Sequence, residues 1–554
     1  MLIFFTVQAR FPGMPALGYL YISKVMKQLS LVITILFLFS CAAGKKKDSE
    51  ASYAARDTSI TTASRYTALT MDTTSLERFL SIEVGNPNDA RRIRDFYGNR
   101  NYQFAWFDEQ GLTEQGEAFW NLHQMLAQKI GDTSAFDREL QKNMAALLDD
   151  ETPSLSRFDM RKTELRLTSE FFRYLQILFK TRIRPEDMQW YIPRRKIDPV
   201  SILDSFLAGN HPELKPLNKF YYRLLDKMTQ YAGIAKKGGW SPIPSIKTAL
   251  KPGSSDPIVA LVKRRLEITG DLSGQDTGPV FTESLRAAVT RMQRSYGMNE
   301  TGIIDDKLIR QLNVPVERRI ETMDINLERT RWLPEEGPDL LVANIPEFRL
   351  HVFENDRPAF AMPVVVGKAA HKTVIFSDTL QYVVFSPYWN VPPSIVRNEM
   401  LPAMKRDKSY LHRNNLEITG NSNGLPVIRQ LPGKDNSLGR VKFLFPNRFN
   451  IYFHDTPSKS LFEKENRAFS HGCVRLGDPI RLAAWLLRDD KTWTHAKILA
   501  AMDQKKEKWV KLDHPIPVFI VYFTAWVTKD GLLNFRDDIY AHDKRMAQHL
   551  FANR

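Results

Sequence analysis

Cysteine is almost absent from this sequence, which has only two in 554 residues, Cys41 and Cys473. Cys41 follows a segment in which the basic Lys27 precedes an apolar run that ends at the small Ser40. A basic head, a short apolar core and a small residue before the cut are typical of a secretory signal. If the Cys41 thiol is acylated when this signal is removed, Cys473 carries the one remaining thiol. No disulfide can then form within the exported chain. Cys473 is therefore not a structural cross-link, and a reactive role is the better interpretation.

Long hydrophobic runs are also missing. The run before Cys41 is shorter than the roughly 20 apolar residues of a membrane-spanning helix, which disfavours a transmembrane anchor. Residues 1–41 instead resemble a bacterial lipoprotein signal, in which cleavage leaves Cys41 as the acylated N-terminus and Met26 is the expected start. The polar residues 42–73 contain few large apolar side chains and are expected to form a flexible tether. We therefore expect a protein of the cell envelope, located in the periplasm and anchored to a membrane by lipid.

Acidic residues are in the minority, because 63 Asp and Glu face 78 Lys and Arg, giving a formal charge of +15. Such a charge attracts acidic partners. An exported chain rarely meets nucleic acid, so we expect no nucleic-acid partner and favour peptidoglycan stem peptides or anionic lipid head groups. A generally basic proteome explains the charge equally well. The hydrophobic content of 43% supports folded cores, and a chain of this length suits several domains.

The hydrophobic pattern divides the rest of the chain into four parts. Residues 74–250 space apolar side chains at helical intervals, as in "TELRLTSEFFRYLQILFK", and predict a helical domain. Residues 251–316 predict a small helical module, residues 317–541 alternate as strands do, and residues 542–554 form a C-terminal tail. Strand character is lost from about 392 to 439, which predicts a lid inserted into the β-rich domain, and Arg357–Pro358 is expected to separate two strands. The expected fold class is multidomain α+β.

The small module has recognisable helix ends. Thr282 is expected to cap the N-terminus of one helix, and Gly270 and Gly297 are expected to end two helices. Together with "FTESLRAAVTRMQRSYGMNETG" and the closing Leu312–Asn313, these features resemble the three-helix peptidoglycan-binding modules of cell-wall enzymes. A purely structural helical linker is the alternative.

Cys473 lies in "AFSHGCVRLGDP", and its chemistry depends on the preceding "NRFNIYFHD". In an extended strand, Asn450, Tyr452 and His454 share one face. The 18 residues between His454 and Cys473 allow a loop that returns alongside this strand, so thiol and imidazole are expected to meet. The imidazole can then take the thiol proton and hold the ion pair, while the N–H groups of Gly472 and Cys473 approach a developing oxyanion. This arrangement predicts acyl transfer through a thioester.

Two histidines compete for the role of base. His471 shares a face with Cys473 in an extended segment, but it lies about 7 Å away along the chain. His454 can approach more directly from an adjacent strand and is favoured. A zinc site formed by His454, His471 and Cys473 is conceivable, but the paired CxxC or HExxH spacing of strong zinc motifs is missing. We expect neither a metal nor another cofactor.

The same residues resemble a family signature. A histidine, a spacer and then Ser/Thr-His-Gly-Cys, a hydrophobic residue and Arg form the pattern of the L,D-transpeptidase (YkuD-type) family, matched here by His454, Ser470, His471, Gly472, Cys473, Val474 and Arg475. Segments such as "NIPEFRLHVFEN" and "VVFSPYWNVPPSI" are similar to the large periplasmic branch of that family. "FYGNRNYQFAW" and "WYIPRRKIDP" resemble its scaffold domain.

This resemblance implies a nucleophile at Cys473, a base at His454 and a position near the acyl site for Tyr452. Since some members have Ser at the position of His471, that side chain is not expected to be the base. Arg475 is expected to support the loop or bind a substrate carboxylate, with a structural ion pair as an equal alternative.

The implied reaction joins two peptidoglycan stems. The enzyme attacks a tetrapeptide stem, releases D-alanine and passes the acyl group to a second stem, which forms a 3→3 cross-link. Two alternatives stay open: a hydrolase on the same fold, such as an L,D-carboxypeptidase or an amidase-like enzyme, and a non-enzymatic peptidoglycan-binding lipoprotein. Other wall-synthesis proteins are possible partners.

Overall fold

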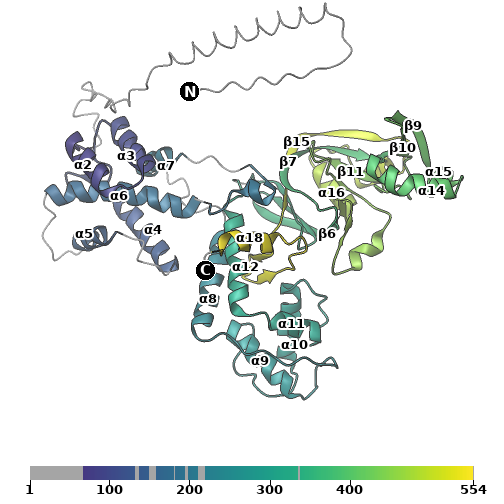
Figure 1. Cartoon of the computed structure of the whole chain (residues 1–554), viewed down its shortest axis with the longest axis horizontal. Helices are drawn as coiled ribbons and strands as arrows, with labels where there is room; N and C mark the ends of the chain where they lie inside the picture. The colour runs from purple at the N-terminus through teal and green to yellow at the C-terminus, as the bar shows by residue number, and fades with distance from the viewer. Residues whose placement is uncertain are drawn as a thin grey trace, which may run out of the picture.

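The structure is a computed structural model that describes residues 67–130, 137–148, 157–179, 181–193, 198–209, 219–334 and 337–552. The expected signal, Cys41 and the tether up to residue 66 lie outside these ranges. Within them, no helix combines the length and apolar character needed to cross a bilayer. Figure 1 shows an N-terminal group of helices, a small helical module and a strand-rich region from which a small unit projects.

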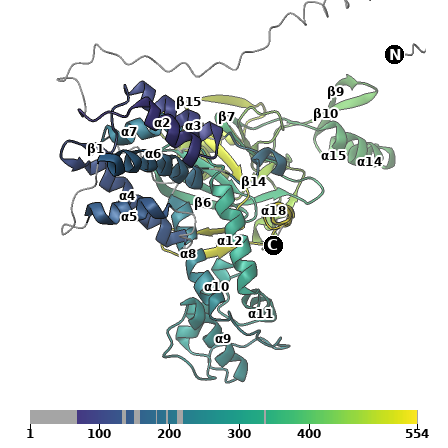
Figure 2. The same ribbon diagram turned by 60° about the vertical axis from the view of Figure 1, so that its left-hand side comes forward.

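The N-terminal helical domain packs around α6, which Figure 2 shows running through its middle. Its core holds Trp106 and Phe171, neither of which is exposed to solvent. Side chains cap several helix starts, as where Asp72 accepts a hydrogen bond from the Ser75 N–H. The elements of this part of the chain are α2 (Thr73–Glu83), α3 (Pro87–Asn99), β1 (Phe107–Asp108), β2 (Gly111–Leu112), α4 (Glu114–Ile130), α5 (Arg138–Leu148), α6 (Arg157–Phe179), η2 (Pro185–Met188), β3 (Trp190–Tyr191), α7 (Pro199–Leu207) and α8 (Lys219–Lys236). The buried side chains of η2, β3 and α8 belong to other apolar cores than that of Trp106 and Phe171.

The helical module consists of α9 (Pro257–Thr269), α10 (Glu283–Ser295) and α11 (Asp306–Leu312) around its own apolar core. The helix ends expected from the sequence are present. Thr282 caps α10 by accepting from the Leu285 N–H, and Gly270 ends α9 in a left-handed conformation. The long α12 (Val316–Thr330) then connects the module to the strand-rich domain.

The strand-rich domain is built on one large sheet that closes on itself. Its strand order is β11-β12-β14-β6-β5-β4-β15-β7-β3, and an additional pairing of β11 with β7 completes the closure. The edge strand β3 comes from the N-terminal helical domain and pairs in parallel with β7. The other strands are β4 (Leu340–Asn344), β5 (Arg349–Glu354), β6 (Arg357–Gly367), β7 (Ile375–Phe385), β11 (Val441–Leu444), β12 (Phe453–His454), β13 (Ala468–Ser470), β14 (Val474–Leu476) and β15 (Lys508–Val521).

One expected break between strands is wrong by two residues. Strand β6 already begins at Arg357 and includes Pro358. The turn is made instead by Asn355 and Asp356, whose φ angles are 48° and 61°. Two positive φ angles match the tight hairpin turn that asparagine and aspartate tolerate, so this pair joins β5 to β6 without help from the proline.

The residues expected to form a lid make a small unit with its own core. A sheet of β8 (Trp389–Asn390), β10 (Leu425–Gln430) and β9 (Leu416–Ser422) packs beside α13 (Pro393–Ile395), η3 (Val396–Met400), α14 (Leu401–Arg406) and α15 (Tyr410–Arg413). The core includes Val396, Met400 and Ile428. This lid projects from the strand-rich domain in both views (Figures 1 and 2).

The C-terminal elements complete the domain. Asp478 caps α16 by accepting from the Arg481 N–H, and Pro479 takes the first helical position. Residues 542–550, expected to be a tail, form the helix α18, which contacts α12. The remaining elements are η4 (Lys459–Glu463), α16 (Pro479–Leu486), α17 (His495–Met502), β16 (Ala525–Val527), β17 (Leu533–Phe535) and α18 (His542–Leu550).

Candidate active site

Cys473 lies in the turn between β13 and β14, and β14 runs parallel to β12. The pairing places Phe453 opposite Val474 and His454 opposite Arg475. The segments carrying the thiol and the favoured histidine are therefore neighbours in the sheet, as the sequence predicts. The strand at His454 is shorter than expected, because Asn450 has a φ of 54° and leaves the extended conformation.

The thiol of Cys473 faces the chain that leads into β12. Its Sγ lies 3.7 Å from the carbonyl oxygen of Asn450. Burial raises the thiol pKa, while hydrogen bonds from the Tyr452 main chain and phenol and the charge of Arg475 act in the opposite direction. Burial also raises the pKa of Tyr452, as does the neighbouring sulfur. Tyr452 is therefore a neutral donor at neutral pH and contacts the nucleophile.

His454 is buried, with 4% of its surface exposed, and its ring centre lies 5.7 Å from that of Tyr452. Its Nδ1 lies 2.5 Å from the carbonyl oxygen of Asp455. A carbonyl can only accept, so Nδ1 carries the proton and Nε2 of the neutral ring has the free lone pair. Burial and then the charge of Arg475 lower the pKa of His454 to about 3. The imidazole is therefore a neutral base over the physiological range.

These two shifts correct one expectation from the sequence. A raised thiol pKa and a lowered imidazole pKa both favour the neutral pair of Cys473 and His454. Both directions disfavour the ion pair that was expected between the two groups. A neutral imidazole beside a neutral thiol is an arrangement suited to general-base catalysis.

His471 lies at the rim of the site, with 39% of its side chain exposed. Its Nε2 is 3.2 Å from a carboxylate oxygen of Glu399, which belongs to η3 of the lid. The rings of His371 and His471 are also neighbours, with ring centres 5.1 Å apart. The two candidate bases therefore have different surroundings. His454 is buried in the sheet, and His471 is at the rim, where it contacts the lid.

The oxyanion donors differ from the expected pair. The Gly472 N–H donates to Ser470 Oγ at 3.1 Å, and this hydroxyl donates to the Cys473 carbonyl at 2.6 Å. The expectation that the Gly472 N–H is free is therefore wrong. The Cys473 N–H has no protein acceptor in the part of the chain that the structure describes. It is the main-chain donor that remains for an oxyanion.

Arg475 is a half-buried cation beside the thiol and the imidazole. Its Nε is buried without an acceptor, and it forms no ion pair with any carboxylate in the described ranges. This disfavours a purely structural ion pair. Its charge instead lowers the pKa of both Cys473 and His454.

Several contacts at the site could not be found from the sequence. The buried Thr373 donates a hydrogen bond to the Gly472 carbonyl, and the buried Tyr540 accepts one from the Thr373 N–H. These residues are far apart in the chain, and no spacing rule connects them. The hydrogen bond of Ser470 with the Gly472 N–H is different, because Ser470 belongs to the motif itself. Its place directly before His471 is a feature of the sequence that points to a role in the turn.

The described residues contain no group of three or more His, Cys, Asp or Glu side chains arranged to hold a metal ion. In particular, His454, His471 and Cys473 do not converge on one point, because His471 turns toward Glu399.

Three family matches cover much of the chain. Residues 338–498 match the "L,D-transpeptidase catalytic domain", residues 91–228 a "Scaffold domain", and residues 255–312 a "Putative peptidoglycan binding domain". The resemblance stated from the sequence is thereby confirmed, as is its mixed α+β, multidomain architecture.

One curated relative, named "Putative L,D-transpeptidase", is from Haemophilus influenzae. It is 31% identical over 242 residues, which are 41% of this chain and 49% of the relative. The chain thus spans about half the length of the curated relative that it matches.

Solved L,D-transpeptidases are also similar to this chain. The protein from Stackebrandtia nassauensis is 14% identical with a TM-score of 0.21, covering 50% of this chain and 96% of its own. L,D-transpeptidase 3 from Mycobacterium tuberculosis is 15% identical with a TM-score of 0.18, covering 34% of this chain and 63% of its own.

Proposed function

Because this chain carries an L,D-transpeptidase catalytic domain with a scaffold domain and a peptidoglycan-binding domain, we propose that it is a cysteine L,D-transpeptidase that cross-links peptidoglycan stems. The observation that carries the proposal is the position of Cys473. Its thiol lies against Tyr452 on the segment that leads to His454, and its own N–H is available to an oxyanion. Nucleophile, base and oxyanion donor are thus grouped at one turn of the sheet.

The first half of the reaction forms a thioester. Sγ of Cys473 attacks the carbonyl between the diamino acid and the terminal D-alanine of a tetrapeptide stem, and Nε2 of His454 takes the thiol proton. The Cys473 N–H stabilises the oxyanion of the tetrahedral intermediate. When the intermediate collapses, the imidazolium returns the proton to the leaving amine, and D-alanine departs.

The second half transfers the acyl group. A side-chain amine of a second stem attacks the thioester, loses a proton to His454 and forms the new amide as the sulfur leaves. The sulfur regains its proton from the imidazolium, so both groups return to their neutral resting forms. If water replaces the amine, the same steps produce a hydrolase, and the acceptor therefore decides between the two activities.

The direct test uses purified protein and a disaccharide tetrapeptide. Mass spectrometry is expected to detect free D-alanine and a dimer joined by a 3→3 link, and Cys473→Ala is expected to produce neither. D-Alanine release with tripeptide monomer alone would indicate the hydrolase. An intact-mass adduct with a carbapenem on wild-type protein, but not on Cys473→Ala, would support Cys473 as the nucleophile. An adduct on the Ala variant would contradict that assignment.

We also propose that the protein is held in the periplasm by lipid on Cys41. Cys41→Ser is expected to move the protein from the membrane fraction to the soluble fraction. The basic Lys45–Lys47 could hold the chain on anionic head groups at about 1 kcal/mol per charge, but salt screens that attraction. A high-salt wash that releases the wild-type protein would therefore contradict lipid anchoring.

A further inference from the structure

The peptide bond between Gly472 and Cys473 is held in a fixed orientation by a residue outside the motif. The hydroxyl of Thr373 donates a hydrogen bond to the Gly472 carbonyl at 2.8 Å, and the contact is buried. In a trans peptide the C=O and the N–H point in opposite directions. The contact therefore directs the Cys473 N–H away from Thr373.

We propose that Thr373, held in place by Tyr540, is a positioning residue that orients the Cys473 N–H as the oxyanion donor of the reaction. This inference rests on the proposed function. It concerns a side chain that acts through the main chain, since the Thr373 hydroxyl donates to the Gly472 carbonyl, on the opposite side of the peptide bond from the Cys473 N–H.

Thr373 has little freedom to turn away, because its hydroxyl and its N–H are both engaged. Its Oγ accepts from the Gly367 N–H at 2.9 Å. A hydroxyl has a single proton, and here that proton goes to the Gly472 carbonyl. The Thr373 N–H donates to the phenol oxygen of Tyr540 at 3.3 Å, and this phenol donates to the Gly367 carbonyl. Thr373 is 1% exposed and Tyr540 is 2% exposed, so water does not compete for these bonds.

The end of β6 fits this arrangement only because residue 367 is glycine. A Cβ on Gly367 would lie 2.0 Å from the carbonyl oxygen of His371. The loop can therefore return closely enough for Thr373 to reach both Gly367 and Gly472. Gly472 itself has a φ of 117°, a conformation that favours glycine.

Tyr540 comes from the C-terminal segment, beyond the residues 338–498 that match the catalytic domain. Its N–H donates to the phenol oxygen of Tyr522 at 2.9 Å, and that phenol donates to Asp538 at 2.7 Å. Lys372 donates to the Tyr540 carbonyl at 2.7 Å. The segment after the matched domain is thus connected to the catalytic turn by consecutive hydrogen bonds.

The test measures oxyanion stabilisation separately from the intrinsic reactivity of the Cys473 thiol. Acylation by a carbapenem passes through an oxyanion, whereas alkylation by iodoacetamide does not. For Thr373→Val, we expect the limiting acylation rate to fall by about tenfold to a hundredfold, since loss of one complete oxyanion donor costs about 10²–10³ in rate. The carbapenem concentration for half-maximal rate and the alkylation rate are expected to change less than about twofold.

Two further variants and one control variant complete the test. Thr373→Ser retains the hydroxyl and is expected to restore most of the acylation rate. Tyr540→Phe removes one phenol from the support and is expected to reduce the acylation rate by a smaller factor; it also provides the answer if Thr373→Val does not fold. Thr330→Val is the matched control, because Thr330 is buried and donates to the Leu327 carbonyl within α12. Its acylation rate is expected to equal that of the wild type.

The outcomes distinguish the two proposals. Normal acylation in Thr373→Val would overturn the positioning role and leave the proposed function intact. An equal fall in acylation and alkylation would also overturn it, because it would show general damage to the turn. A wild-type protein that no carbapenem acylates would overturn the proposed function and this inference together.

Discussion

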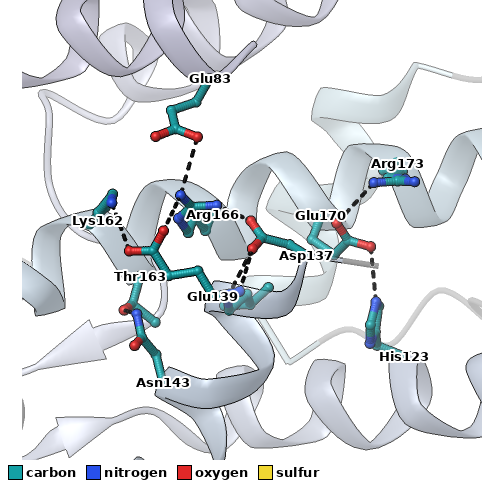
Figure 3. Close-up of polar contacts among 11 residues, drawn as sticks. Glu83, His123, Asp137, Glu139, Asn143, Lys162, Thr163, Arg166, Glu170 and Arg173 are labelled. Atoms are coloured by element: carbon teal, nitrogen blue, oxygen red, sulfur yellow. Dashed lines mark hydrogen bonds and ion pairs between the residues drawn. The ribbon is translucent and has the colours of Figure 1, made fainter. Parts of the chain in front are cut away.

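Two arginines, one in the N-terminal helical domain and one beside the nucleophile, have opposite surroundings. Arg166 on α6 is 9% exposed and contacts the carboxylates of Glu83, Asp137 and Glu139, as Figure 3 shows. Arg475 on β14 is half-buried, yet no carboxylate pairs with it in the described residues, and its buried Nε has no acceptor. The positive charge of Arg166 is thus balanced by carboxylates, whereas the positive charge of Arg475 is not.

The difference indicates what each arginine does. The charge of Arg166 is balanced by groups on α2, on α5 and just before it, so its effect is to hold these elements against α6. The charge of Arg475 instead acts on the pKa of Cys473 and His454. A buried charge without a partner is costly, and such sites are often functional.

The histidines differ in the same way. His123 in the N-terminal helical domain lies 2.9 Å from Glu170, and both are buried. His471 also has a carboxylate partner, whereas the His454 ring is held by main-chain groups, with its Nδ1 donating to the Asp455 carbonyl. With Nδ1 protonated and donating to a carbonyl, the neutral His454 ring has its lone pair on Nε2, where it can accept a proton.

The largest effect is expected from the histidines of the site. His454→Ala should reduce acylation by about 10²–10⁴-fold, the usual contribution of a general base. His471→Ala should reduce it far less, because that ring contacts Glu399 of the lid. Carbapenem acylation at pH 7, followed by intact mass, measures both variants. Equal losses, or a greater loss for His471→Ala, would contradict the choice of base.

A smaller effect is expected when the charge of Arg475 is removed. Its guanidinium lowers the pKa of the thiol, so Arg475→Met should raise that pKa further. At a pH below the thiol pKa, each unit of increase reduces the thiolate fraction, and hence the alkylation rate, by about tenfold. Arg475→Lys keeps the charge and serves as the control. The pH profile of iodoacetamide alkylation gives the midpoint, and an unchanged or lower midpoint in Arg475→Met would contradict this role.

The parts of the site that are local in the chain, or that are joined by a fixed spacing, could be predicted from the sequence. The 18 residues between His454 and Cys473 predicted adjacent segments, and β12 and β14 are neighbours. The contact of Thr373 with Gly472 could not be predicted, because it joins residues 99 apart and depends on how β6 and the C-terminal segment pack. Nor does residue type reveal that the Gly472 N–H is already engaged. Periodicity identifies elements, while such polar contacts depend on tertiary packing.

The smallest effect on chemistry is expected from Arg166, the balanced member of the comparison. Arg166→Met removes the cation from three carboxylates that are between 23% and 43% exposed. Water can partly solvate these carboxylates, so we expect a loss of about 2 kcal/mol in the free energy of unfolding, near the value for hydrogen bonds to charged groups. Acylation per folded molecule should not change, because no step of the reaction uses Arg166.

Arg173 provides the matched control within the same helix. It is 46% exposed and lies 4.0 Å from Glu170, so Arg173→Met should cost less than about 1 kcal/mol, as exposed ion pairs usually do. Urea unfolding monitored by circular dichroism measures both variants, and carbapenem acylation of the folded protein measures the chemistry. If Arg166→Met slows acylation while Arg173→Met does not, the N-terminal helical domain influences the site through this cluster. The distinction between a structural arginine and a functional one would then fail.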